Sequence, residues 1–179
     1  SVISGLLKSH TGTLIFNDLV KDSKVYQGFY GGVIRLTGNF NTLVLKDITS
    51  IVYLTNITAD KLIIENCPAV ILRESLEVEG SSGDIGTLEI RNTYLTIYQA
   101  VSIGTLRCTN RSTWVQKKGT VESVGFIEAG STLVFDTPSE DNQINSIRSS
   151  ALQGLFYTNN PTPELPYLEE IFLAQKPIS

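Results

Sequence analysis

Three acidic residues are the best candidates for chemistry in this sequence. Glu65 and Glu89 lie in apolar, strand-like segments, and Asp84 follows a Gly- and Ser-rich stretch at 80–83. Two carboxyl groups about 5–9.5 Å apart can cleave a glycosidic bond. Neighbouring strands of a sheet lie about 4.8 Å apart, so acids on adjacent strands can reach this spacing. We therefore take Glu65, Asp84 and Glu89 as the candidate catalytic residues.

Basic residues occupy positions equivalent to these acids, and they support a second interpretation. Lys46 and Arg91 take the same place as Glu65 in the repeat described below, and Arg107 takes that of Glu89. Alternating charges on adjacent strands form a ladder that contributes a few tenths to about 1 kcal/mol per pair. The pattern favours structural ion pairs over catalysis.

Aromatic residues suggest a binding surface. Tyr53 and Trp114 are expected to point outward from the second strand of the repeat, and Tyr98 is expected next to this outward column. Flat rings exposed along a sheet can stack on sugars, so Tyr53, Tyr98 and Trp114 are the candidate ligand-binding residues. The alternative is that a loop or another subunit covers these rings, because each carries a large apolar area.

The sequence lacks the residues for several other chemistries. His10 is the one histidine, and Cys67 and Cys108 stand alone in apolar segments, so we expect no catalytic triad, no metal site and no cofactor. Both cysteines are interpreted as small core residues. A net charge of −4 without a basic run argues against nucleic acid as a partner. Every apolar run is far shorter than the roughly 20 residues that membrane insertion requires.

A short repeat decides the expected fold. A Leu-x-apolar triplet, followed two residues later by Asn, Asp or Thr, recurs at intervals between 18 and 29 residues. The period of two places the first and third residues inside and the second outside. Unequal intervals exclude a helical repeat of constant length and fit the coils of a solenoid with insertions at its corners. The triplets start at Leu14, Leu43, Leu62, Leu88, Leu106 and Leu133.

A second series of short strands follows the first, for example at Val52–Leu54 and Val70–Leu72. Longer coils have room for a third strand, so we predict three short parallel faces per coil. The repeat stops after Pro138, where the chain becomes rich in Asn, Ser and Pro. We expect an N-terminal cap at 1–12, coils at 13–138, and an irregular C-terminal cap or tail with short helical turns at 139–179.

Asn or Asp ends most of the triplets, notably at Asp47, Asn66, Asn92 and Asn110. Stacked amides at such turns can bond to each other and to the local backbone. These residues resemble the asparagine ladder of the right-handed β-helix family, the pectate-lyase-like and tailspike-like proteins. The resemblance implies an all-β fold, a right-handed single-stranded parallel β-helix. The alternative is that Asn and Asp mark ordinary turns of a β-sandwich.

An apolar stripe indicates a contact with another surface. Val44 and Ile63 point outward on consecutive coils, and Ile15 is expected beside them. Solvent-facing positions do not require such residues, so we take Val44 and Ile63 as interface candidates. Tailspike-like β-helices associate side by side as trimers, so the resemblance implies a homotrimer.

The leading hypothesis is a fragment of a phage tailspike or pre-neck appendage, located in the virion or outside the cell. It would serve as a structural shaft and as a recognition module for a host surface polysaccharide or teichoic acid. A polysaccharide lyase or glycoside hydrolase fragment is one alternative. A bacterial adhesin or autotransporter passenger fragment is another.

Overall fold

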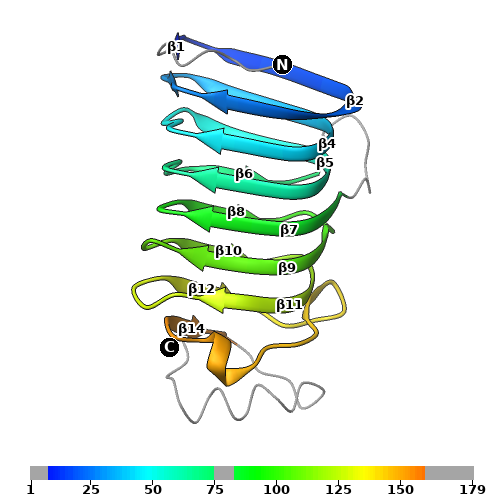
Figure 1. Cartoon of the computed structure of the whole chain (residues 1–179), viewed down its shortest axis with the longest axis vertical. Helices are drawn as coiled ribbons and strands as arrows, with labels where there is room; N and C mark the ends of the chain where they lie inside the picture. The colour runs from blue at the N-terminus through cyan, green and yellow to red at the C-terminus, as the bar shows by residue number, and fades with distance from the viewer. Residues whose placement is uncertain (1–7, 75–82, 160–179) are drawn as a thin grey trace.

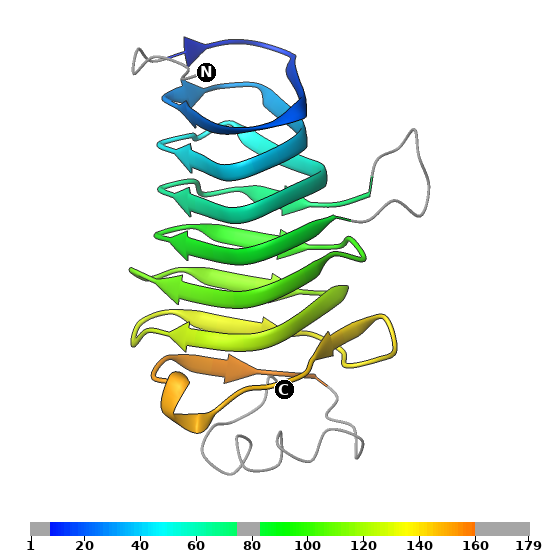
Figure 2. The same cartoon turned by 45° about the vertical axis from the view of Figure 1, so that its right-hand side comes forward.

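The chain folds into a parallel β-solenoid. The computed structural model describes residues 8–74 and 83–159. It contains about seven turns stacked along one axis, and every pairing between named strands is parallel. In each coil the chain crosses the front, turns at the left edge, returns along the back and steps down, which makes the solenoid right-handed (Figures 1 and 2). The all-β, right-handed parallel β-helix predicted from the repeat is confirmed.

Fourteen strands and one 3-10 turn make up the described part of the chain. They are β1 (Lys8–Ser9), β2 (Thr13–Gln27), β3 (Phe29–Tyr30), β4 (Val33–Lys46), β5 (Ile51–Glu65), β6 (Val70–Leu72), β7 (Asp84–Arg91), β8 (Tyr94–Ile97), β9 (Ser102–Thr109), β10 (Thr113–Gln116), β11 (Gly119–Ile127), β12 (Thr132–Phe135), β13 (Asn142–Ile144), η1 (Ser149–Ala151) and β14 (Leu155–Tyr157).

Two long faces and one short side form the wall of the solenoid. The back face consists of the first halves of β2, β4 and β5, followed by β6, β8, β10, β12 and β14. The front face consists of the second halves of β2, β4 and β5 together with the ends of β7, β9 and β11. The short side carries β13 and the first residues of β7, β9 and β11.

The core is a set of in-register columns of apolar side chains. On the front face, one column is led by Leu43 and a second by Leu45, and each member faces its counterpart on the next coil. Burial of such side chains contributes about 25 cal/mol per Å² of apolar surface. The side chains of these two columns are almost completely buried: Leu43, Leu62, Leu88, Leu106 and Val124, then Leu45, Ile64, Ile90, Cys108 and Ile127.

Two of the six triplets lie on a different face from the one predicted. Leu14 pairs with Ile34, and Leu133 pairs with Trp114, which places both triplets on the back face. Val124 instead continues the front-face column below Leu106. An apolar-x-apolar triplet has the same form on either face, so the sequence pattern alone did not show to which face each triplet belongs.

Trp114 points inward, contrary to the prediction. It lies in register between Leu95 and Leu133 and is fully buried. Its Nε1 donates a hydrogen bond to Gln116 Oε1 at 3.2 Å, inside the core. Gln116 also points inward and is buried. Because a polar residue takes this inward position, the alternation of polar and apolar residues in β10 led to the wrong prediction that Trp114 points outward.

The solenoid extends beyond residue 138, where its coils were expected to end. β13 pairs with β11 and β14 pairs with β12, both in parallel, and Ile144 and Phe156 continue the core. An insertion between β12 and β13 and the turn η1 interrupt the repeat in sequence but not in space. Of the expected N-terminal cap, β1 pairs with β3, while residues 1–7 and 160–179 lie outside the described residues.

The front strands β2, β4, β5, β7 and β9 are each followed by a left-handed turn residue, and these residues together define the turn edge. The φ angles are +81° at Gly28, +54° at Asp47, +54° at Asn66, +46° at Asn92 and +55° at Asn110. Asn and Asp adopt this conformation more readily than other side-chain-bearing residues. Asn66 Nδ2 donates to Asp47 Oδ1 at 2.9 Å, and Asn92 Nδ2 donates to Asn66 Oδ1 at 2.8 Å. The predicted ladder therefore joins three residues, and Asn110 shares only their backbone conformation.

We predict that Asn66→Ala lowers the free energy of unfolding by about 2 kcal/mol, since alanine loses two ladder bonds and adopts a left-handed backbone at a cost. Asn66→Gly should cost less, because glycine accepts the backbone conformation. Asn110→Ala is the matched control, because it has the same backbone cost but removes no ladder hydrogen bond. Urea unfolding measures all three, and equal losses for Asn66→Ala and Asn110→Ala would show that the ladder adds nothing.

Both cysteines are free, buried core residues. Burial raises the pKa of the Cys67 thiol to about 12, and the carboxylates of Asp47 and Glu65 add to the shift. Burial also raises the pKa of Cys108 well above its ordinary value of 9.0. Both thiols therefore stay neutral in the folded protein under conditions that ionise them in the unfolded chain.

This difference predicts a pH dependence of stability. A raised folded pKa leaves stability intact below the unfolded value near 9.0 and removes it as the pH rises toward 12. Between pH 8 and pH 10 we expect a loss of roughly 1.4 kcal/mol for each thiol. Chemical unfolding of the Cys67→Ala Cys108→Ala variant should show that much less dependence on pH than the unmodified chain. An identical dependence would contradict the assignment.

Candidate functional site

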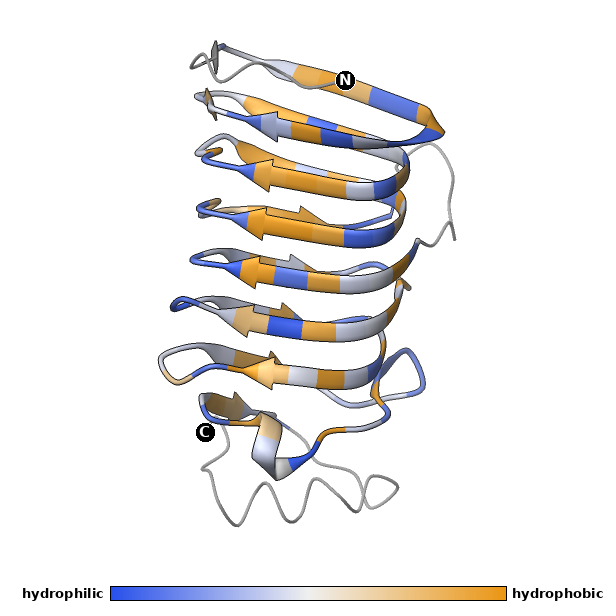
Figure 3. Cartoon of the chain, viewed as in Figure 1, coloured by the Kyte–Doolittle hydropathy of each residue, from blue (hydrophilic) through white to orange (hydrophobic). Residues whose placement is uncertain are grey.

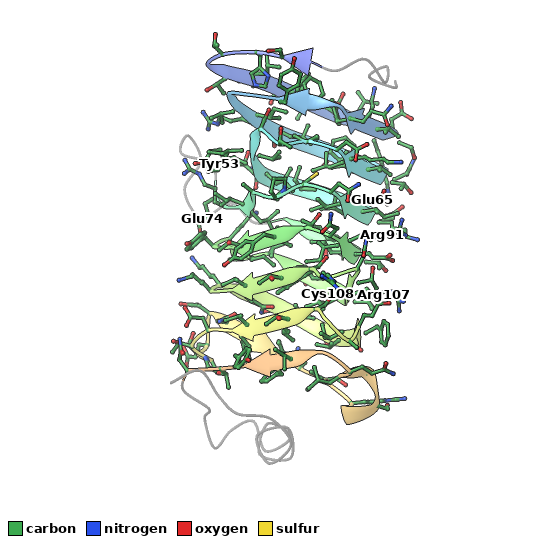
Figure 4. The ribbon with its side chains drawn as sticks, turned by 90° about the vertical axis from the view of Figure 1, so that its left-hand side faces the viewer. Tyr53, Glu65, Glu74, Arg91, Arg107 and Cys108 are labelled. Atoms are coloured by element: carbon green, nitrogen blue, oxygen red, sulfur yellow. The ribbon has the colours of Figure 1, made fainter. Side chains whose placement is uncertain are left out.

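Glu65 and Glu89 lie on the front face in two columns of charged side chains. Arg91 Nε bonds to Glu89 Oε2 at 2.5 Å, and its Nη1 lies 3.4 Å from Glu65 Oε1. Lys46 Nζ approaches Glu65 Oε2 at 3.8 Å, and Arg107 Nε approaches Glu89 Oε1 at 3.5 Å. The hydrogen bond to Glu89 raises the pKa of the Arg91 guanidinium. Figure 4 shows Glu65, Arg91 and Arg107 along one side of the molecule.

This arrangement does not resemble a pair of catalytic carboxylates. Each of the four carboxylate oxygens of Glu65 and Glu89 faces a cationic group, which stabilises the charged form of both acids and does not favour the protonated form that a general acid needs. Asp84 is exposed on the short side, beside Thr58 and Ser102 of the adjacent coils. The ion pairs expected from the repeat are therefore present around Glu65 and Glu89, and Asp84 lies apart from them.

We predict that Arg91→Ala lowers the free energy of unfolding by about 1 to 2 kcal/mol, because Glu89 is largely buried and loses its closest partner. High salt should reduce the effect on the more exposed pair with Glu65. Arg148→Ala, at an exposed arginine without an ion pair among the described residues, is the control. Urea unfolding at two salt concentrations checks this, and an unchanged midpoint would mean that the ladder does not stabilise the fold.

The half-buried Tyr53 and the exposed Tyr98 lie on the back face and do not converge. The Arg73 guanidinium covers the Tyr53 ring at 4.7 Å from its centroid. Tyr98 is 48% exposed, and the Lys117 ammonium lies 5.8 Å from its ring centroid. β5, which carries Tyr53, and β8, which Tyr98 directly follows, are two coils apart. With Trp114 buried, the three predicted rings do not form one sugar platform.

A shallow hollow of about 290 Å³ opens on the turn edge instead. The turn edge faces the viewer in Figure 4, between the front-face charges and the side that carries Tyr53. Two residues of the ladder, one tyrosine and one arginine are among the residues that line it. Its lining residues are Asn66, Pro68, Asn92, Thr93, Tyr94, Arg111 and Thr113.

Two of these residues, Tyr94 and Arg111, were not singled out from the sequence. Tyr94 starts β8 and is 49% exposed, out of phase with the inward Leu95. Arg111 follows Asn110 in the turn and has φ +60°. The period-two pattern of β8 could have identified Tyr94 as outward. Nothing in the pattern distinguished Arg111, because its position depends on a second left-handed residue in the same turn.

Comparisons with known proteins identify no relative. No protein-family model, no curated protein and no solved structure matches the chain. Within residues 8–74 and 83–159, no cluster of His, Cys, Asp or Glu could hold a metal ion. No helix in the same residues has the length and apolar character to cross a membrane. The function is therefore argued from the surfaces of the solenoid.

Proposed function

We propose that the chain is a shaft module of a phage tailspike or similar appendage, assembled as a side-by-side homotrimer and bearing a recognition surface for a host cell-surface glycan. Its place would be the virion tail or another extracellular structure. A mostly apolar column of outward-facing residues on the back face carries the proposal. Regular parallel strands suit a stiff, elongated support of this kind.

The back-face column is mostly apolar, and its side chains range from exposed at Ile15 to buried at Val115. Six of its eight in-register residues are aliphatic or aromatic, with Arg35 and Thr96 as the exceptions. Val33, Ile51 and Leu155 flank it on the same face. Monomeric proteins seldom leave long contiguous apolar patches exposed. The column runs Ile15, Arg35, Tyr53, Ile71, Thr96, Val115, Val134 and Tyr157.

The shape of this column favours a second copy as its partner. Eight strands at about 4.8 Å extend it over roughly 34 Å, far beyond one sugar or a short peptide side chain. A parallel copy offers the same repeat, so its side chains can pack into the column coil after coil. Self-association therefore covers the whole column with one contact.

The front face offers a smaller apolar patch. Val44 lies between Val25 and Ile63 in one outward column, followed by Glu89 and then Arg107. Figure 3 shows this change from apolar to charged residues. An uninterrupted orange run lies near the ends of β4 and β5, whereas a blue residue interrupts the orange in β7 and β9. Ile15, expected beside Val44, lies on the back face instead. Val44 and Ile63 remain candidates for a second contact between copies.

The mass of the particle tests the proposal. We expect light scattering to give about three times the chain mass of 19.6 kDa. Ile71→Lys combined with Val134→Lys should produce a monomer, because lysines within the column introduce like charges into the contact. Ser102→Lys, on the exposed short side, is the matched control. Val44→Lys with Ile63→Lys examines the smaller patch in the same assay.

Circular dichroism of each variant verifies that the β-structure is retained. A monomeric unmodified chain that ignores a panel of cell-wall and capsular glycans would overturn the proposal and favour an adhesin passenger. A monomer that cleaves one of these glycans would favour the enzyme alternative.

A further inference from the structure

We propose that the turn-edge hollow binds one anionic sugar unit of a glycan chain, with the acidic group on Arg111 and the sugar ring against Tyr94. This inference rests on the glycan-recognition part of the proposed function. The hollow lies at the edge of the back face. Tyr94 and Thr113, which pair in register, belong to the outward column that flanks the back-face column on the side of the turn edge.

The backbone at Arg111 departs from the pattern of the other turns. Among the described residues with positive φ, all the others are Gly, Asn or Asp, the types that accept this conformation at low cost. An arginine here costs stability that a glycine would not. Strained residues of this kind concentrate at sites that use them. The turn places the guanidinium at the rim of the hollow, where a ligand can use it.

Arg111 also lacks an ion pair, unlike the front-face arginines. Its stem lies 3.6 Å from the position of a Cβ built on Gly130 of the next turn. The Glu128 carboxylate on that turn accepts a hydrogen bond from the Asn110 N–H at 2.7 Å and forms no ion pair with Arg111. No other described acid pairs with Arg111. A planar guanidinium left free in this way suits a carboxylate or phosphate group, which it can bind with two hydrogen bonds.

The remaining walls fit the ring of a sugar. Tyr94 and Pro68 supply apolar surface that can pack against the C–H face of a pyranose. No described donor bonds to Asn92 Oδ1, so the ladder ends there with a free acceptor at the hollow. The Thr113 hydroxyl, which has no partner among the described residues, adds a group that can donate or accept. Together they complement the hydroxyl groups of one sugar unit.

The size of the hollow sets the length of the bound segment. At about 290 Å³ it lies near the lower end of the roughly 300–1,000 Å³ range of small-molecule sites. The contact therefore holds one unit of a longer chain. Its acidic group could be the carboxylate of a uronic acid or the phosphate of a teichoic acid, and both present the same charged oxygens to Arg111.

Isothermal titration calorimetry of the full chain tests the site with three probes: a trigalacturonate, a short poly(glycerol phosphate) and the neutral cellotriose. We expect saturable binding of at least one anionic probe, weaker binding of cellotriose and weaker anionic binding at high salt. The probe that binds identifies the carboxylate or the phosphate source. Arg111→Gln should weaken the anionic binding at least tenfold, and Arg111→Lys should restore part of it.

Arg148→Gln is the matched control, at an exposed arginine on another turn. It should bind like the unmodified chain, and Tyr94→Ala should bind more weakly. Absence of saturable binding, or equal affinity in Arg111→Gln, would overturn the site. Light scattering on the same samples separates the two proposals. If the chain is a monomer and binds through Arg111, only the proposed trimer is overturned. If the chain is a trimer and does not bind the probes, only the proposed binding site is overturned.

Discussion

Parallel pairing in fixed register between successive coils is the constraint on which the rest of this structure depends. Once Leu43, Leu62 and Leu88 stack, every neighbouring residue is assigned to a column, inward or outward. A slip of one residue would move the whole inward set to the surface. Left-handed Asn and Asp residues follow β4, β5, β7 and β9, where they reverse the chain direction at the turn edge, and side-chain hydrogen bonds join three of them between coils.

The sequence was sufficient to predict the solenoid but not the face to which each triplet belongs. The fold rests on alternation, which is a local property, so the β-helix and the ladder from Asp47 to Asn92 were found. The face rests on pairing between coils, which depends on the length of every corner. For this reason Leu14 and Leu133 were placed on the wrong face, and Trp114 was given the wrong direction.

The candidate site also combines features that follow from the local sequence pattern with features that depend on how the coils stack. Glu65 and Glu89 were correctly placed beside basic residues, because equivalent positions in the repeat become neighbours in space. Tyr94 and Arg111 come from two successive turns, and the hollow between them exists only when those turns stack. A repeat analysis compares equivalent positions, such as Tyr94 and Thr113, whereas Arg111 lies in a turn with one more residue than the turn before it.

A solenoid of this kind offers two sorts of surface, and they suit different partners. Its flat faces present side chains in straight columns about 4.8 Å apart, so a group on one coil meets the matching group on the next and pairs with it. That geometry pairs Glu65 and Glu89 of the front face with basic residues, and on the back face it produces the mostly apolar column on which the proposed self-association rests. Groups can converge from different directions only where the chain bends. The proposed ligand site therefore lies at the turn edge, where Arg111 forms no ion pair with any described residue.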